Sequence, residues 1–194
     1  MLKKTLNNEI RYARFENEED FLKEILHRIG IIEVYPKVSA IAGKKIRPDI
    51  DLLEIKRESQ NKFKVIGYEL KLIKFKKENK ALSWYSFYQG LGQALLSLTH
   101  GIHRGILLIG FHRNVPDDKL IDEFHDMLWE GRENLFPQIL GSYISIGTYL
   151  YRGGNINYEI EAKSDFYPLN ERINLSRQNL LNKNFTYEKK LRNK

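Results

Sequence analysis

Two neighbouring stretches of the chain, IRPDIDLLE at residues 46–54 and KVIGYELKLI at residues 64–73, decide which fold the sequence predicts. In both, apolar residues alternate with charged or small ones, which is the two-residue period of a β-strand with one buried face. The turn-like sequence ESQNK at residues 58–62 separates them. We therefore expect an antiparallel hairpin. The two faces of its second strand are Ile66, Tyr68, Leu70 and Leu72 on one side and Val65, Gly67, Glu69 and Lys71 on the other.

Helices and further strands are expected on both sides of this hairpin. Asn17 can cap a helix at about residues 17–29, whose apolar residues repeat at helical spacing until Gly30. The other expected elements are a short strand at 31–35, a loop at 37–45, a helix at 82–99, a buried strand at 105–111, a helix from Pro116 to about Glu130, a strand pair at 143–151 and 157–162, and a helix at 170–182. This order predicts an α/β fold in which helices pack against a mixed sheet.

The chain is expected to form a single domain. Its 194 residues, of which 42% are hydrophobic, suit one globular unit, and no linker or repeat interrupts the pattern. We place the domain at residues 1–183, with its core at about 17–112, and a basic tail at 184–194.

Several function classes are excluded by composition. Without cysteine the chain has no disulfide scaffold, thiol nucleophile, Cys-ligated zinc or iron–sulfur cluster. The most apolar stretch, 105–111, is far shorter than the roughly 20 residues of a membrane-spanning helix, and residues 1–15 lack the apolar segment of a secretion signal. We therefore expect a soluble, cytoplasmic protein without a membrane partner.

The net charge of +7 lies in one part of the chain. Residues 37–80 hold thirteen Lys and Arg against six Asp and Glu, so this stretch accounts for all of it. A concentrated positive charge favours an acidic partner such as DNA, although a solvated surface is the simpler alternative. The candidate phosphate-contacting residues are Lys44, Lys45, Arg47, Lys74, Lys76, Lys77 and Lys80.

Acidic residues inside this basic stretch carry the candidate chemistry. Strand pairing is expected to bring Asp49 beside the Glu-Leu-Lys triplet at 69–71. Glu69 and Lys71 share a face because they are two residues apart, and the Leu70 carbonyl lies near them. Two carboxylates, a carbonyl and room for water suit Mg²⁺. Such an ion lowers the pKa of a bound water and offsets charge on phosphoryl oxygens.

Two charged neighbours complete this candidate site. Lys71 would orient or deprotonate the water or hold the phosphate, and its ammonium offsets the repulsion between the carboxylates. Asp51 shares the face of Asp49, so it is a further candidate ligand or a strand residue paired with a lysine.

The sequence Pro48-Asp49, followed by Glu69-Leu70-Lys71 on the next expected strand, resembles the signature of the PD-(D/E)xK nuclease superfamily. The resemblance covers about residues 17–112. It implies a restriction-endonuclease-like α/β/α core with a central mixed sheet flanked by helices. It also implies hydrolysis of DNA phosphodiester bonds with Mg²⁺, or Mn²⁺ in its place, and a central triad of Asp49, Glu69 and Lys71. Because cutting both strands of a duplex takes two active sites, we expect a homodimer.

Two expected helices offer accessory residues that this resemblance implies. Superfamily members often carry a Glu on the helix before the Pro-Asp strand, and the pattern of archaeal Holliday junction resolvases is similar to the one that begins at Glu19. The helical wheel places Glu18 nearer the apolar stripe, so Glu18 is the alternate. Members also carry a Gln on the helix after the triplet. Gln93 matches that position, and Gln89 on the same helical face is its alternate.

A second function remains open at this point. The serine of the resolvase active loop has no counterpart in residues 74–80, so a junction-resolving role does not follow. The alternative to a nuclease is a non-catalytic DNA-binding or scaffold protein on the same fold, in which the charged strand residues only pair with one another.

Overall fold

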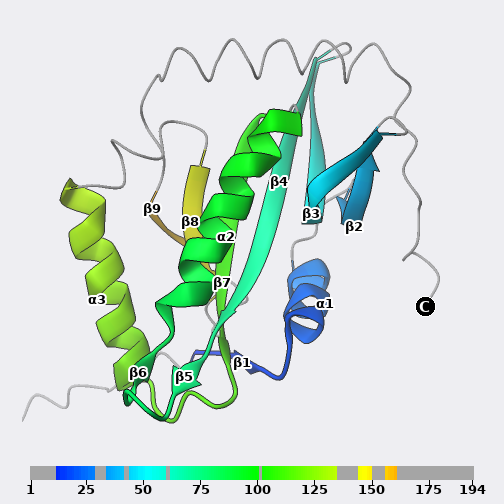
Figure 1. Ribbon diagram of the computed structural model, residues 1–194. Coiled ribbons are helices and arrows are strands. Elements are labelled where there is room, and N and C mark those ends of the chain that lie inside the picture. The colour runs from blue at the N-terminus through cyan, green and yellow to red at the C-terminus, as the bar shows by residue number, and fades with distance from the viewer. Residues whose placement is uncertain are drawn as a thin grey trace, which may run out of the picture.

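The computed structural model describes residues 12–28, 34–41, 44–59, 62–100, 102–134, 144–149 and 156–160, and shows a curled mixed β-sheet with helices (Figure 1). The helices are α1 (Glu18–Arg28), α2 (Trp84–Ser97) and α3 (Lys119–Asn134), with a 3-10 turn at Leu98–His100. The strands are β1 (Arg14–Phe15), β2 (Val34–Ile41), β3 (Lys44–Ser59), β4 (Lys62–Ile73), β5 (Phe75–Lys76), β6 (Ala81–Leu82), β7 (Arg104–His112), β8 (Ile144–Tyr149) and β9 (Ile156–Ile160). The α/β class expected from the sequence is confirmed.

The main sheet has the strand order β2-β3-β4-β7-β8-β9, with β1 paired to the end of β7. Neighbours are antiparallel from β2 to β4, parallel from β4 through β7 to β8, and antiparallel between β8 and β9. Strands β5 and β6 form a separate small hairpin. The predicted β3–β4 hairpin and the predicted terminal strand pair are therefore both present.

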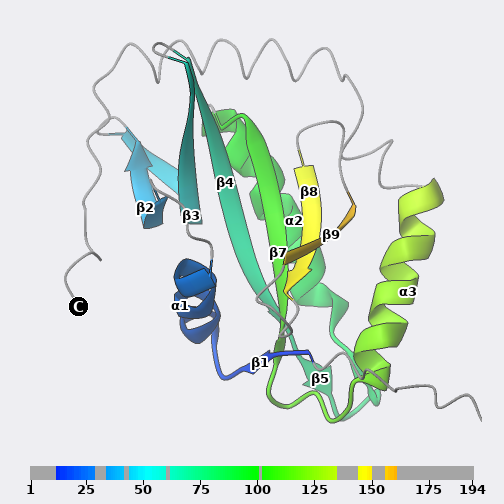
Figure 2. The ribbon, with the colours of Figure 1, turned by 180° about the vertical axis from the view of Figure 1, so that it is seen from behind.

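Helices cover both faces of the sheet, as the opposite views in Figures 1 and 2 show. On one face, Phe21, Leu22 and Ile25 of α1 pack on buried residues of β4 and β7. On the other face, α2 and α3 bury Phe87 and Phe124 against β7. Fully burying one such side chain contributes roughly 1.5–3 kcal/mol to folding. These two apolar layers hold β4 and β7 in the centre of the molecule.

Short polar side chains begin two of the helices. The Asp20 backbone N–H donates to Asn17 Oδ1 at 2.9 Å, so Asn17 caps α1 as predicted. The Leu120 N–H donates to Asp117 Oδ1 at 3.0 Å at the start of α3. Helix α1 therefore begins one residue after its predicted start, and α3 begins three residues after its predicted start at Pro116.

The predicted loop at residues 37–45 is wrong, because most of this stretch belongs to β2 and β3. Pro36 argued against a strand, since proline cannot donate to a β-ladder. However, β2 is the edge strand of the sheet, and an edge position tolerates proline. Strands β1, β5 and β6 were not predicted. The predicted helix at 170–182 and the tail at 184–194 lie outside the described residues.

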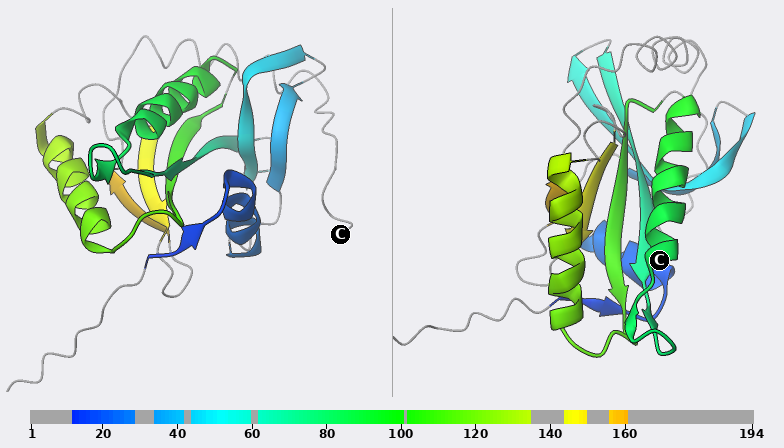
Figure 3. Two further views of the ribbon diagram at one scale, coloured as in Figure 1. Left: turned by 60° about the horizontal axis from the view of Figure 1, so that its bottom comes forward. Right: turned by 60° about the vertical axis from the view of Figure 1, so that its left-hand side comes forward.

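A divergence of strands opens the sheet beside β4. Residues Leu52–Ser59 of β3 pair with β4, whereas its earlier residues, back to Lys44, pair with β2. Figure 3 shows β2 and β3 turning away from the remaining strands. Asp51 lies at this divergence, one residue before the β3–β4 pairing begins. Residues 69–73 of β4 are thus not paired with β3, and α1 packs near this part of the strand.

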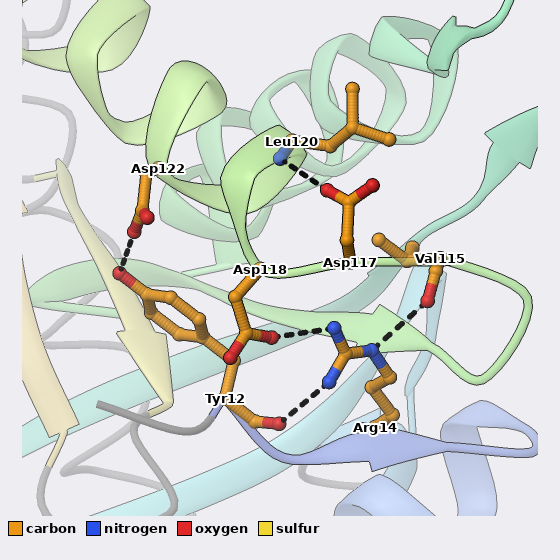
Figure 4. A network of polar contacts seen from close by, with 7 residues as sticks. All are labelled: Tyr12, Arg14, Val115, Asp117, Asp118, Leu120 and Asp122. Carbon is orange, nitrogen blue, oxygen red and sulfur yellow. Dashed lines mark hydrogen bonds and ion pairs between the residues drawn. The ribbon is translucent and has the colours of Figure 1, made fainter. Parts of the chain in front are cut away.

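The N-terminal segment is tied to the start of α3 by polar contacts (Figure 4). The Tyr12 hydroxyl donates to Asp122 at 2.8 Å. The Arg14 guanidinium donates to the Val115 carbonyl at 3.0 Å and to Asp118 at 2.5 Å. This network fixes β1 at the end of β7. No helix in the described part of the chain is long and apolar enough to cross a membrane.

Candidate active site

Glu69 and Lys71 lie side by side near the C-terminal end of β4, on the face covered by α2. Their side chains are 6% and 9% exposed, and Lys71 Nζ donates to Glu69 Oε1 at 2.6 Å. Gly90 of α2 permits this packing, because a Cβ there would lie 2.6 Å from Lys71 Cγ and from Leu107 Cδ1. Glu69 and Lys71 therefore share one face of β4, as the sequence predicted.

Asp51 is the carboxylate that faces Glu69 across the two strands. The antiparallel register pairs Leu52 with Tyr68, so the next residues in line, Asp51 and Glu69, lie opposite each other. Asp51 Oδ2 accepts a hydrogen bond of 2.9 Å from the Leu70 backbone N–H, and the Asp51 side chain is 12% exposed. The charge of Asp51 is close enough to Glu69 to raise its pKa. Asp51 and Glu69 are therefore two buried carboxylates in one place.

The same hydrogen bond orients the Leu70 carbonyl. In a strand, the N–H and C=O of one residue point to the same neighbouring side. Because the Leu70 N–H points to Asp51, its carbonyl also points to the β3 side of β4, where the strands diverge. The backbone thus places an oxygen near both carboxylates.

The electrostatics of the site reflect this crowding. Burial, reinforced by the charge of Asp51, raises the pKa of Glu69 from 4.5 to about 7, although Lys71 acts in the opposite direction. For Lys71, burial lowers the pKa, but the hydrogen bond and charge of Glu69, with smaller contributions from Glu18 and Asp51, outweigh burial and raise it above 10.5. Lys71 therefore stays protonated at neutral pH, which favours holding an anion over accepting a proton.

The prediction for Asp49 is confirmed only in part. We expected strand pairing to bring it beside Glu69, but the register gives that position to Asp51. The side chain of Asp49 is 44% exposed and pairs with Arg47 Nη1 at 3.0 Å. It still borders a small pocket together with Glu69 and Gln93. The two aspartates share a strand face, so the sequence alone had no means of choosing between them.

The helix α1 brings Glu18 toward the site, and the expectation for Glu19 is corrected. Glu18 Oε1 lies 3.9 Å from Lys71 Nζ. Glu19 points to Lys23 on its own helix at 3.2 Å, with 72% of its side chain exposed. Residues one apart on a helix point in directions about 100° apart, so only one of the two glutamates can face Lys71.

On α2, Gln93 reaches the site and Gln89 does not contact it. Gln93 Oε1 is buried and has no hydrogen-bond partner among the described residues, and its side chain lines the pocket with Asp49 and Glu69. Gln89 is exposed. An unpaired buried amide oxygen costs about 1–3 kcal/mol unless a ligand or water satisfies it. Gln93 is thus the residue of this helix whose oxygen could bind a metal ion or accept a hydrogen bond from a ligand.

The predicted phosphate-contacting residues lie mainly on the surface. Lys45 and Arg47 are exposed on β3, and four lysines surround the β5–β6 turn: Lys74, Lys76, Lys77 and Lys80. Lys44 begins β3, and its side chain lies outside the described ones. A further lysine, Lys37, was not predicted as a site residue, but its Nζ lies 2.5 Å from Asp51 Oδ1. The alternation of β2 would have pointed to it had that stretch been read as a strand.

The residues present fit a hard divalent cation, although no group of three acidic, histidine or cysteine side chains converges as a ready-made metal site in the described ranges. Mg²⁺ is commonly held by one or two carboxylates and keeps several waters. Asp51, Glu69, the Leu70 carbonyl and the unpaired Gln93 Oε1 are all oxygen donors. Burial and the charge of Asp51 raise the pKa of Glu69, so a cation bound beside this carboxylate would stabilise its ionised form.

In comparisons with known proteins, no protein-family model, no curated protein and no solved structure matches the chain.

Proposed function

We propose that the chain is a Mg²⁺-dependent DNA endonuclease with a PD-(D/E)xK active site. The single observation that carries this proposal is the pair of buried carboxylates, Asp51 and Glu69, set opposite each other beside Lys71. The element order supports it, since helix α1 precedes the β3–β4 hairpin and α2 and the buried β7 follow. Within this proposal Asp51 replaces Asp49 as the aspartate of the signature.

Within this proposal, some residues of the site would bind the metal ion, and Lys71 would bind the phosphate or the attacking water. Asp51, Glu69, the Leu70 carbonyl and Gln93 would hold Mg²⁺, with Mn²⁺ as a substitute. When bound, the cation supplies positive charge to the phosphoryl oxygens and lowers the pKa of water. Lys71, protonated and fixed by Glu69, holds a phosphate oxygen or the attacking water in position. Glu18 adds to the charge that keeps Lys71 protonated.

The surface charge supports DNA as the substrate. The exposed lysines around the β5–β6 turn, together with Lys45 and Arg47, offer contacts to the phosphate backbone. Such contacts are independent of base sequence and weaken as salt rises. A homodimer would place two such sites on a duplex, and its formation is part of the proposal.

The test is cleavage of plasmid and linear duplex DNA with and without Mg²⁺, using Asp51→Asn, Glu69→Gln and Asp49→Asn. We expect the first two variants to lose cleavage by about 100-fold or more, as for other groups that stabilise transition-state charge. We expect Asp49→Asn, which changes an exposed side chain, to retain most of it. Undiminished cleavage by the Asp51→Asn, Glu69→Gln double variant would contradict the proposal.

A specific observation also favours the alternative, a non-catalytic DNA-binding or scaffold protein. Each buried carboxylate already has a lysine partner, Lys37 for Asp51 and Lys71 for Glu69, so the charges balance in part without a metal. Calorimetry distinguishes the two functions. The nuclease requires Mn²⁺ binding that Glu69→Gln weakens, whereas the scaffold requires DNA binding with no Mn²⁺ binding.

A further inference from the structure

Lys37 of the edge strand β2 lies in line with the two buried carboxylates. Its neighbours Pro36 and Val38 pair with Leu52 and Ile50 of β3, so Lys37 lies opposite Asp51. Asp51 in turn lies opposite Glu69 of β4. A lysine, an aspartate and a glutamate therefore occupy one row across three strands.

The backbone of Lys37 is held in an unusual conformation. Its φ of 51° lies in the left-handed region, and the β2–β3 register shifts between Val38 and Ala40. Residues other than glycine adopt this region uncommonly, and such conformations persist where surrounding structure imposes them, often at functional sites. The conformation coincides with a close ion pair, because Lys37 Nζ lies 2.5 Å from Asp51 Oδ1.

The two lysines of the site differ in freedom to move. The Lys71 side chain is 9% exposed and fixed between Glu69 and the packing of α2. The Lys37 side chain is 52% exposed, so solvent can receive its ammonium when the contact with Asp51 breaks. Both oxygens of Asp51 are engaged, one by Lys37 and one by the Leu70 N–H. A divalent cation that uses Asp51 must therefore compete with Lys37.

We infer that Lys37 is a positioning residue of this site: its ammonium occupies Asp51 while no divalent cation is bound, and a divalent cation must displace it. Lys37 thereby lowers the affinity of the site for the cation. This inference rests on the proposed function, since it takes Asp51 as a ligand of the divalent cation.

The test is Mn²⁺ binding measured by titration calorimetry without DNA, at constant ionic strength and pH 8. Lys37→Asn removes the ammonium, and asparagine accepts the left-handed backbone more readily than most residues. We expect this variant to bind Mn²⁺ about twofold to fivefold more tightly than the wild type, the effect of losing one partly exposed ion pair. Lys37→Arg, which keeps the charge, should bind Mn²⁺ close to the wild-type value.

Lys119→Met is the matched control for net charge. Lys119 is 83% exposed on α3 and pairs with Glu123 of the same helix, so its loss should leave Mn²⁺ affinity unchanged. Lys37→Met serves as a second charge-removing variant, and circular dichroism establishes that each variant is folded. Wild-type affinity in the charge-removing variants, or weaker binding, would overturn the inference.

The two proposals fail in different ways. If the wild type binds Mn²⁺ and Glu69→Gln weakens it, but Lys37→Asn does not tighten it, the inference about Lys37 alone is wrong. If the wild type binds no Mn²⁺, the proposed function and the inference are both wrong.

Discussion

Single side chains in the site are governed by charge buried in a small volume. Glu69 and Asp51 lie opposite each other, and two ionised carboxylates at that range repel. Lys71 and Lys37 reduce this repulsion, yet burial and Asp51 still raise the pKa of Glu69 to about 7. The folded protein therefore holds a proton on Glu69 over a pH range in which the unfolded chain does not.

This difference makes stability depend on pH. Below about pH 4.5, Glu69 is protonated in both states, and its contribution to stability is complete. Between about pH 4.5 and 7 only the folded state keeps the proton, so stability falls as pH rises. We expect the free energy of unfolding of the wild type, relative to Glu69→Gln, to fall by up to about 1.4 kcal/mol per pH unit in this window. Urea unfolding at several pH values measures it.

Glu19→Gln is the control for this pH effect. Glu19 lies one position from Glu18, and its side chain is 72% exposed, so this variant should follow the wild-type pH dependence. Parallel curves for the wild type and Glu69→Gln would show that Glu69 titrates normally in the folded protein.

At the scale of elements, α2 holds the site against β4 by close contact. The helix carries no charged residue and packs its Phe87, Gly90, Ala94 and Ser97 side inward. Gly90 allows the helix to touch Lys71 and Leu107, while Gly92, two residues on, has open space where a Cβ would stand. The two glycines thus lie in the same helix, but only Gly90 is in close contact with other side chains.

Alanine at each glycine of α2 should have opposite effects on stability. In Gly90→Ala the new Cβ would overlap Lys71 Cγ and Leu107 Cδ1, both 2.6 Å away, so we expect a loss of about 1–3 kcal/mol from overpacking. In Gly92→Ala we expect a gain of about 0.5–1 kcal/mol, because alanine favours the helix and meets nothing. Urea unfolding measures both. Equal effects at the two positions would show that helix propensity alone decides.

At the scale of the whole molecule, contacts distant in sequence tie the N-terminal segment to the rest. Arg14 reaches Asp118 and the Val115 carbonyl, about a hundred residues away, with 26% of its side chain exposed (Figure 4). Arg113 pairs with Glu16 in the same region, but its side chain is 67% exposed. The two arginines form a matched pair that differs in burial.

Removing Arg14 should loosen this attachment. We expect Arg14→Met to lower the free energy of unfolding by about 1–3 kcal/mol, because it removes charge-assisted hydrogen bonds that are shielded in part from water. We expect less than about 1 kcal/mol for Arg113→Met, a surface ion pair. Thermal or urea unfolding compares them. A loss of stability from Arg113→Met as large as that from Arg14→Met would indicate that burial does not separate the two contacts.

The chain's local patterns determined much of this molecule. The alternation at residues 64–73 sets Leu70 and Leu72 against α1 and Glu69 and Lys71 against α2, as the structure has it. Asn17 marks the start of α1, and the apolar run at 105–111 forms the buried centre of β7. These features follow from short-range periodicity and capping, which depend only on residues near in sequence.

The tertiary structure decided the features that depend on strand register, on helix rotation and on which strand lies at the edge of the sheet. It chose Asp51 over Asp49 opposite Glu69, because both share a face and only the β3–β4 pairing distinguishes them. It chose Glu18 over Glu19 through the rotation of α1 against β4. It also made a strand of residues 34–41, despite Pro36, and so brought Lys37 to Asp51. The sequence by itself determined which residue types meet at the site, since periodicity is local; the pairings needed the fold, since register and helix rotation are set by packing across the whole core.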